Sequence, residues 1–212
     1  MSPIATRIGV MAELQDAYNR QVHPDWRDQG YPYYRAIWVE CAELLDHFGW
    51  KWWKHQRPDL DQVKLEIVDI WHFGLSELLR AGRVASGRVD PTVVRAIEAG
   101  GREGVDFKAA VEALAASTLA ERDFPVDAFM TVMRTLPMSF DELFLQYVGK
   151  NVLNQFRLDH GYRSGEYRKL WGGVEDNVHL IELATELDDG APGYADALYR
   201  ALADRYTASA SS

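Results

Sequence analysis

The chain has 212 residues, 47% hydrophobic and 26% charged, a composition typical of a globular protein and not of a disordered or fibrous one. Its net charge of −9 argues against a protein that binds nucleic acid through general basic charge. The single cysteine, Cys41, excludes an internal disulfide and a four-thiolate zinc site. We find neither a signal peptide nor a run of 18 apolar residues, so we expect a soluble cytoplasmic protein without a membrane span.

Apolar residues recur at helical spacing along most of the chain, which predicts an all-α fold. No Asn-Gly or Asp-Gly turn joins two alternating runs, as a β-hairpin would need. Asp59 is the expected N-cap of one helix, and Ser139 with Glu142 forms a capping box for another. The expected helices span residues 6–21, 34–49, 59–81, 139–161, 171–188 and 192–206, with short helices between 82 and 137.

Two pairs of carboxylates share a spacing of three residues, Glu40 with Glu43 and Glu66 with Asp69. Residues three apart project from nearly the same side of a helix, and the angular neighbours of both pairs are apolar. Four inward carboxylates cannot all stay ionised in a dry core, because desolvation and mutual repulsion oppose their charges. Since Mg²⁺ is a hard cation that prefers oxygen ligands, the pattern predicts a magnesium site.

A ferritin-like di-iron bundle is the main alternative for inward carboxylates, and it needs a Glu-x-x-His motif on each of two helices. The nearest approach in this sequence is Asp69-x-x-His72, which disfavours that alternative. His47 lies within reach of the Glu40 and Glu43 face. A lone histidine there is more typical of a hydrogen-bonded neighbour than of a metal ligand.

A second group is cationic. Lys150, Asn154 and Arg157 follow a spacing of four and three, which places them on one stripe of a helix. Residues 150–169 carry five basic and two acidic side chains, a net charge of +3. A helix dipole explains a cation at the end of a helix but not Lys150 near the opposite end. We therefore expect phosphates to be held by metal and side chains, since the sequence has no P-loop motif.

Aromatic and amide side chains provide a third group. The segment Trp50-Lys51-Trp52-Trp53-Lys54 directly follows the first acidic pair. Adjacent tryptophans usually belong to a packed turn, but a ring beside a metal and phosphate site can stack on a nucleobase. Phe73, close to Asp69, can supply the other face of such a sandwich. Gln15 and Asn19 lie one helical turn apart and offer amides suited to a pyrimidine edge.

Together these motifs resemble the dimeric all-α dUTP diphosphatases within the MazG-like nucleoside triphosphate pyrophosphohydrolases. The resemblance rests on four blocks, which are LQxxxN at 14–19, ECAEL at 40–44 with WKWWK at 50–54, EIVDIWHF at 66–73, and KNVLNQFRLDHGYRSGEYRKLWGGVEDN at 150–177. The last block is the most specific. Residues 82–137 match loosely and are interpreted as an insertion.

The resemblance implies a helical bundle with a rigid metal-binding helix pair and a mobile phosphate-binding segment. It implies that two or more Mg²⁺ ions, or Mn²⁺ as a substitute, are held by Glu40, Glu43, Glu66 and Asp69. Glu43 is the expected general base. The implied phosphate-binding group is Lys51, Lys150, Asn154, Arg157, Tyr162 and Lys169. The implied uracil pocket is Gln15, Asn19, Trp50 and Phe73. Asp176 and Asn177 fall in a family motif, but no separate role can be assigned to them.

The implied reaction is the Mg²⁺-dependent hydrolysis of dUTP, and of dUDP, to dUMP, which clears dUTP and supplies the precursor of dTTP. The expected assembly is a homodimer that binds neither nucleic acid nor a membrane. Two alternatives within the enzyme class are a dCTP and dUTP hydrolase and a broader MazG-like pyrophosphohydrolase. A nucleotide sensor without turnover is the alternative outside it, and the four intact carboxylates disfavour that reading.

These assignments divide the chain. We expect residues 1–81 and 138–206 to form the catalytic helical domain, in which residues 34–49 and 59–81 carry the metal ligands. The phosphate-binding segment spans residues 147–177, where Gly161 and Gly165 permit movement. Residues 82–137 form a smaller helical insertion and residues 207–212 a frayed tail.

Overall fold

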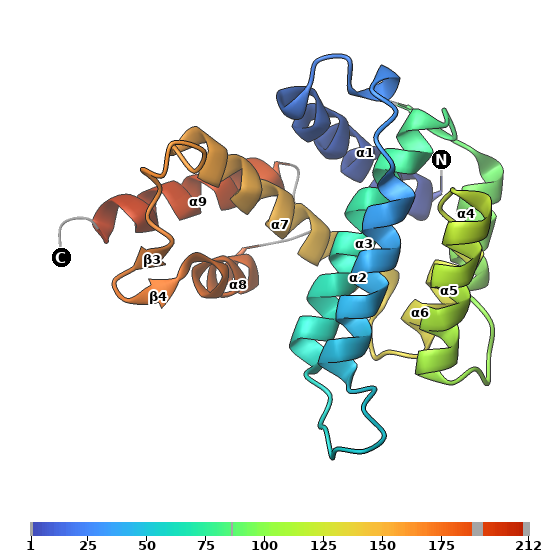
Figure 1. Cartoon of the computed structure of the whole chain (residues 1–212). Helices are drawn as coiled ribbons and strands as arrows, with labels where there is room; N and C mark the ends of the chain where they lie inside the picture. Colours follow the sequence, from blue (N-terminus) through green and yellow to red (C-terminus); the bar gives the residue numbers. More distant parts are fainter. Residues whose placement is uncertain (1, 86, 188–192, 210–212) are drawn as a thin grey trace. The chain divides into compact units, whose positions relative to one another are not determined.

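The computed structural model describes residues 2–85, 87–187 and 193–209 of the chain (Figure 1). Within these ranges it contains nine α-helices, one 3₁₀ turn and two short antiparallel hairpins, so the predicted all-α fold is confirmed. The chain forms two compact units, residues 1–144 and residues 145–212. None of the helices in the described ranges is long and apolar enough to cross a membrane.

The first unit is built around a pair of helices, α2 (Tyr33–Phe48) and α3 (Leu60–Arg80), which lie side by side in Figure 1. Asp59 caps α3 as predicted, because its side chain accepts a hydrogen bond from the Gln62 N–H. α1 (Pro3–Val22) packs against α3 and is followed by the 3₁₀ turn Trp26–Asp28. The two helices together carry the four predicted acidic ligands, Glu40 and Glu43 on α2 and Glu66 and Asp69 on α3.

Residues 82–137 pack against the helix pair. A hairpin of β1 (Val84–Ala85) and β2 (Arg88–Val89) precedes three helices. These are α4 (Pro91–Ala99), α5 (Phe107–Glu121) and α6 (Val126–Arg134). α5 contacts α2, and Phe107 stacks on Phe48 with ring centroids 4.0 Å apart. The segment that the sequence suggested as an insertion thus supports α2 within the first unit.

The core behind α3 is aromatic. Trp71 is fully buried and lies 5.9 Å from Phe124 and 5.4 Å from Phe129 between ring centroids. Its indole N–H donates to the sulfur of Met11 on α1 at 3.2 Å. Gly74 lies beside this cluster, and a Cβ atom there would come within 2.6 Å of the Phe124 ring. Only a residue without a side chain fits at this point of α3.

The second unit contains most of α7 (Phe140–Asp159), which begins at the predicted capping box, where Ser139 Oγ accepts from the Glu142 N–H. α8 (Asp176–Glu186) and α9 (Tyr194–Ala208) follow. The core of this unit is again aromatic. The contacting rings belong to Phe156, Tyr167, Trp171, Tyr199 and Tyr206.

The helix predicted over residues 171–188 begins later than expected. Its first five residues belong to a hairpin of β3 (Leu170–Trp171) and β4 (Val174–Glu175). Gly172 and Gly173 form its two-residue turn with φ of 58° and 85°, a left-handed conformation that glycine adopts without strain. The Gly-Gly pair was a turn signal that the helical interpretation overlooked. Residue 188 lies outside the described residues.

The last predicted helix, over residues 192–206, begins at Tyr194 and continues to Ala208. Thr207 and Ala208, which we expected in the frayed tail, therefore belong to the final turn of α9. Residues 192 and 210–212 lie outside the described residues.

The close packing at Gly74 gives a first prediction. In an open helix position Gly→Ala stabilises a protein by about 0.5–1 kcal/mol, but overpacking a rigid core costs about 1–3 kcal/mol. We expect Gly74→Ala to lower the free energy of unfolding measured in urea. Gly9→Ala in α1 is the matched control, because a Cβ there meets nothing within 4 Å, and it should raise that free energy. Stabilisation by both substitutions would contradict the packing described.

Candidate active site

Three carboxylates meet on the α2–α3 pair. Glu40 and Glu43 come from α2 and Glu66 from α3, and one oxygen of each lies within 4.8 Å of the others. Glu66 is buried, Glu40 is half-buried and Glu43 is exposed. The expectation of an inward orientation therefore holds for Glu66 and in part for Glu40, but not for Glu43. A water molecule can reach this group from the side of Glu43.

Asp69 lies one turn after Glu66 on α3 and is half-buried. It is outside the set of three that meet within 4.8 Å, yet its charge acts on Glu40. Burial, the hydrogen bond with Glu66, and the negative charges of Asp69 and Glu43 raise the pKa of Glu40 from 4.5 to about 8. The carboxylates around Glu40 therefore repel one another, and their repulsion opposes the ionisation of Glu40.

Two further side chains of α2 border the acidic group. His47 places Nε2 3.4 Å from Oε1 of Glu66, which is an ion pair when the imidazole is protonated. Cys41 is buried with 1% of its surface exposed. Burial and the nearby Glu40 raise the pKa of its thiol to about 12. The thiol is therefore inert as a nucleophile in the folded protein.

The two amides predicted to read a base are buried and joined to α3. Gln15 Nε2 donates to Asn19 Oδ1 at 3.0 Å, and Asn19 Nδ2 donates to Ser76 Oγ at 2.9 Å. Gln15 Oε1 lies 2.8 Å from Nδ1 of His72, and Ser76 Oγ donates to the His72 carbonyl at 3.0 Å. With a proton on Nδ1 of His72, all four bonds run in one direction around a closed ring. This buried polar ring fixes which way each amide points.

The proposed aromatic sandwich is not assembled within the chain. Trp50 lies in the loop after α2, is 45% exposed, and donates its indole N–H to Asp46. Lys51 also contacts Asp46, at 3.2 Å. The loop returns to α3 at Asp59, and Phe73 lies 14 residues further along that helix, about 20 Å at 1.5 Å per residue. The structure therefore separates Trp50 from Phe73.

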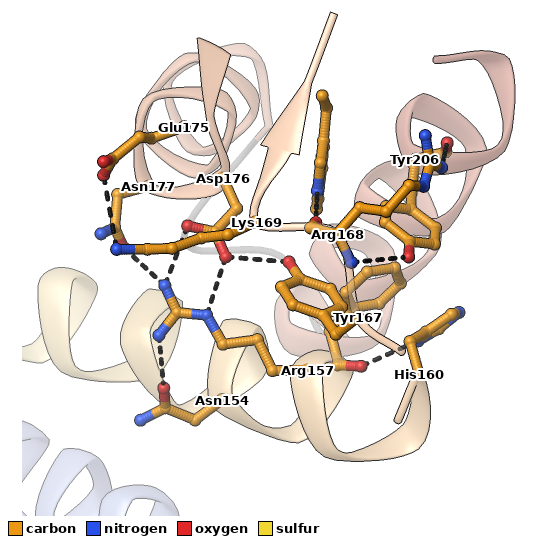
Figure 2. Close-up of polar contacts among 12 residues, drawn as sticks. Asn154, Arg157, His160, Tyr167, Arg168, Lys169, Glu175, Asp176, Asn177 and Tyr206 are labelled. Atoms are coloured by element: carbon orange, nitrogen blue, oxygen red, sulfur yellow. Dashed lines mark hydrogen bonds and ion pairs between the residues drawn. The ribbon is translucent and has the colours of Figure 1, made fainter. Parts of the chain in front are cut away.

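The cationic group of the second unit centres on a buried ion pair (Figure 2). Arg157 donates from Nε and Nη2 to the two carboxylate oxygens of Asp176, at 2.8 and 2.9 Å. It also donates to Asn154 and Asn177, at 3.2 and 3.4 Å. Tyr167 donates its hydroxyl to the same carboxylate at 2.8 Å. Arg157, which we expected to bind phosphate, is thus largely occupied by protein acceptors.

The other predicted phosphate ligands differ in exposure. Lys150 and Asn154 are half-buried on α7, whereas Tyr162 and Lys169 are exposed on the segment after it. Lys169 lies 3.7 Å from a carboxylate oxygen of Glu175, a loose ion pair. Of these four side chains, Lys150 and Lys169 carry positive charge, whereas Asn154 and Tyr162 offer neutral hydrogen-bond donors.

Sequence reasoning overlooked three residues of these networks, namely His72, Ser76 and Tyr167. His72 and Ser76 lie on the same face of α3, one turn apart, but the side chain that each meets on α1 is 57 positions away in sequence. The spacing of residues within one helix cannot predict a contact between residues so far apart in the sequence. Tyr167 lies within the cationic run of residues 150–169, and its hydroxyl in that position could have indicated a hydrogen bond within the group.

The all-α fold and the carboxylates gathered on a helix pair agree with the family that the sequence motifs resemble. A family model described as dUTPase matches residues 7–162, and the chain therefore belongs to the dUTPase family. It is a hydrolase of nucleotide metabolism with dUTP diphosphatase activity. The match includes the acidic group and the Lys150 to Tyr162 run, whereas Lys169 and Asp176 lie beyond it. A search of curated proteins found no match.

The raised pKa of Glu40 gives a second prediction. Because the folded pKa of about 8 exceeds the ordinary 4.5, ionisation of Glu40 weakens the metal-free fold as pH rises from 4.5 through 8. We expect Glu40→Gln to raise Tm in EDTA at pH 8.5 by about 3–6 °C, after discounting for solvent screening, and to have little effect at pH 5. Thermal unfolding at both pH values measures this. Glu112→Gln, at an exposed position of α5, is the control, and an equal shift in both variants would contradict the assignment.

Proposed function

We propose that the chain hydrolyses dUTP, and also dUDP, to dUMP in a Mg²⁺-dependent reaction that clears uracil nucleotides and supplies the precursor of dTTP. The observation that carries this proposal is the convergence of Glu40, Glu43 and Glu66 on the α2–α3 pair. Membership of the dUTPase family supplies the substrate. The metal requirement, the use of dUDP and the roles of single residues are the parts we propose.

The donor set fits a hard divalent cation. All four candidate ligands, Glu40, Glu43, Glu66 and Asp69, offer carboxylate oxygens, which Mg²⁺ prefers and which Mn²⁺ also accepts. The raised pKa of Glu40 supports a cation, because positive charge here would relieve the repulsion that raises it. When bound, two or more such ions neutralise phosphate charge and lower the pKa of a coordinated water.

Within this group the side chains take different parts. Glu43 is the exposed member, so we assign it the role of general base that removes a proton from the attacking water. Glu66 is buried and lies beside His47, so we assign it the role of a fixed oxygen ligand at the buried side of the group. Lys51, beyond the end of α2, remains a candidate helper for phosphate.

Phosphate binding falls to the second unit. We assign it to Lys150, Asn154, Tyr162 and Lys169, which offer ammonium, amide and hydroxyl donors on α7 and the segment after it. Arg157, which the sequence suggested as a direct ligand, already uses both edges of its guanidinium on Asp176 and its neighbours. We therefore assign Arg157 to holding this segment together.

The base is selected by the polar ring of Gln15, Asn19, His72 and Ser76. Uracil has acceptors at O2 and O4 and a donor at N3, and cytosine reverses the pattern at positions 3 and 4. An amide that could flip would accept both bases. Because the ring fixes Gln15 and Asn19 in direction, a cytosine would leave buried polar groups unpaired, which costs about 1–3 kcal/mol for each group. Phe73 and Trp50 remain candidates for stacking, with Trp50 requiring a rearranged loop.

The active protein is proposed to be a cytoplasmic homodimer. The family resemblance supports the dimer, and the use of a single, buried cysteine suits a reducing compartment. Sedimentation equilibrium of the purified chain measures the assembly directly.

The metal assignment gives a third prediction. We expect EDTA to abolish dUTP hydrolysis and Mg²⁺ to restore it. Glu40→Gln, Glu43→Gln, Glu66→Gln and Asp69→Asn should each lower kcat/KM by about 10²-fold or more, because each removes a charged ligand while keeping its size. Diphosphate release at saturating Mg²⁺ is the assay. Glu98→Gln, at an exposed position of α4, is the control and should retain full activity.

Near-wild-type turnover in the folded amide variants would refute the metal site and leave only the family assignment.

Base selection gives a fourth prediction. Gln15→Ala and Asn19→Ala should lower the ratio of kcat/KM for dUTP to that for dCTP about 10- to 100-fold, corresponding to one or two unpaired groups. Ser76→Ala should act in the same direction but less strongly, since it removes a support of Asn19 and no direct contact. Parallel assays with dUTP, dCTP and dTTP measure the ratios, with Gln29→Ala on an exposed turn as the control. If wild-type protein used dCTP as well as dUTP, the chain would be a dCTP and dUTP hydrolase.

A further inference from the structure

The side chain of Asp176 is unusual for a carboxylate because none of its surface is exposed. It lies in the first turn of α8, in the second unit. A buried carboxylate is costly unless its lone pairs are filled by donors. Here two come from Arg157 and one from Tyr167, at 2.8 to 2.9 Å. These three short, charge-assisted hydrogen bonds fill most of the lone pairs of one side chain.

The donors come from separate parts of the chain. Arg157 lies near the end of α7, Tyr167 lies 10 residues later in the connecting segment, and Asp176 opens α8 (Figure 2). The carboxylate therefore ties α7, the connecting segment and α8 to one point. Burial is offset by these bonds, and the pKa of Asp176 is lowered while that of Arg157 is raised, so both groups stay charged.

The candidate phosphate ligands are arranged around this point. Arg157 donates to Asn154 at 3.2 Å, and its guanidinium lies 6.0 Å from the centre of the Tyr162 ring. Lys169 is two residues after Tyr167 and pairs with Glu175, the residue before Asp176. Asn154 and Tyr162 thus each contact Arg157, which is bonded to Asp176. Lys169 lies two residues after Tyr167, which is also bonded to Asp176.

We propose that Asp176 is a positioning residue for the phosphate-binding group: it holds Arg157 and Tyr167 in place, and through them sets the positions of Asn154, Tyr162 and Lys169. The inference rests on the proposed function, in which these three residues bind phosphate. It also gives Asp176 the separate role that its sequence motif left open. Arg157 serves here as an internal counter-ion and not as a free cation.

The test is Asp176→Asn in the full-length chain. The amide keeps the size of the side chain but turns an NH₂ group toward donors, so the bonds to Arg157 or Tyr167 are lost. We expect KM for dUTP to rise at least tenfold with kcat changed less than threefold. The inhibition constant of inorganic diphosphate, the probe for phosphate binding alone, should rise in parallel.

Three variants control for a general loss of folding. Leu198→Ala removes a fully buried side chain of α9 in the same unit and should lower Tm without raising KM. Tyr167→Phe removes a single hydrogen bond and should raise KM about two- to fivefold, which keeps the test informative if Asp176→Asn does not fold. Asp176→Glu retains the charge and should recover part of the loss.

The outcomes separate the two claims. An unchanged KM in both Asp176→Asn and Tyr167→Phe, or a rise in KM in Leu198→Ala equal to theirs, would overturn the positioning role. A lower KM in Asp176→Asn would also overturn it, since Asp176 would then only neutralise Arg157. If Asn154→Ala and Lys169→Ala leave KM unchanged, the proposed phosphate-binding group itself is wrong.

Discussion

Repulsion between carboxylates held within 4.8 Å of one another is the constraint on which the first unit depends. Such a group forms only if the two helices that carry it cannot move apart. The buried aromatic core around Trp71 anchors α3, α2 packs along α3, and α5 packs on α2. The helices between residues 82 and 137 thus contribute to the site without supplying a ligand, since they brace the pair against the repulsion of its own charges.

The two units treat buried charge differently. In the second unit Asp176 is fully buried and meets Arg157 and Tyr167, and its pKa is lowered. In the first unit Glu40 lies among other carboxylates, and its pKa is raised to about 8. The charge of Asp176 is neutralised by partners within the folded chain, so this carboxylate serves as a structural anchor. The charges around Glu40 repel one another, and strongly shifted pKa values of this kind are typical of functional sites.

Sequence periodicity and capping predicted most of the helices, because these depend on residues three or four apart. Asp59 and Ser139 marked helix starts correctly, and the spacing of Glu40 with Glu43 placed both on one helix side. The hairpin at residues 170–175 was missed because its signal is a two-residue glycine turn between very short strands.

Within the site, the residue types were predictable but their partners were not. The polar ring joins residues 57 positions apart, so its geometry depends on how α1 packs on α3. The chemistry of a guanidinium suggests phosphate as readily as carboxylate, and only the folded structure shows that Asp176 occupies Arg157. Likewise, the sandwich of Trp50 and Phe73 overlooked the rise of α3, which places Phe73 about 20 Å beyond the point where the loop of Trp50 rejoins the helix.

The buried thiol of Cys41 has a practical consequence. It is the chain's single cysteine, it follows Glu40 on the acidic helix, and its pKa of about 12 keeps it protonated in the folded state. A thiol-specific reagent can modify it only while the buried face of α2 is open to solvent. The rate of that modification therefore measures how often the buried face of α2 around Cys41 opens to solvent, without an engineered label.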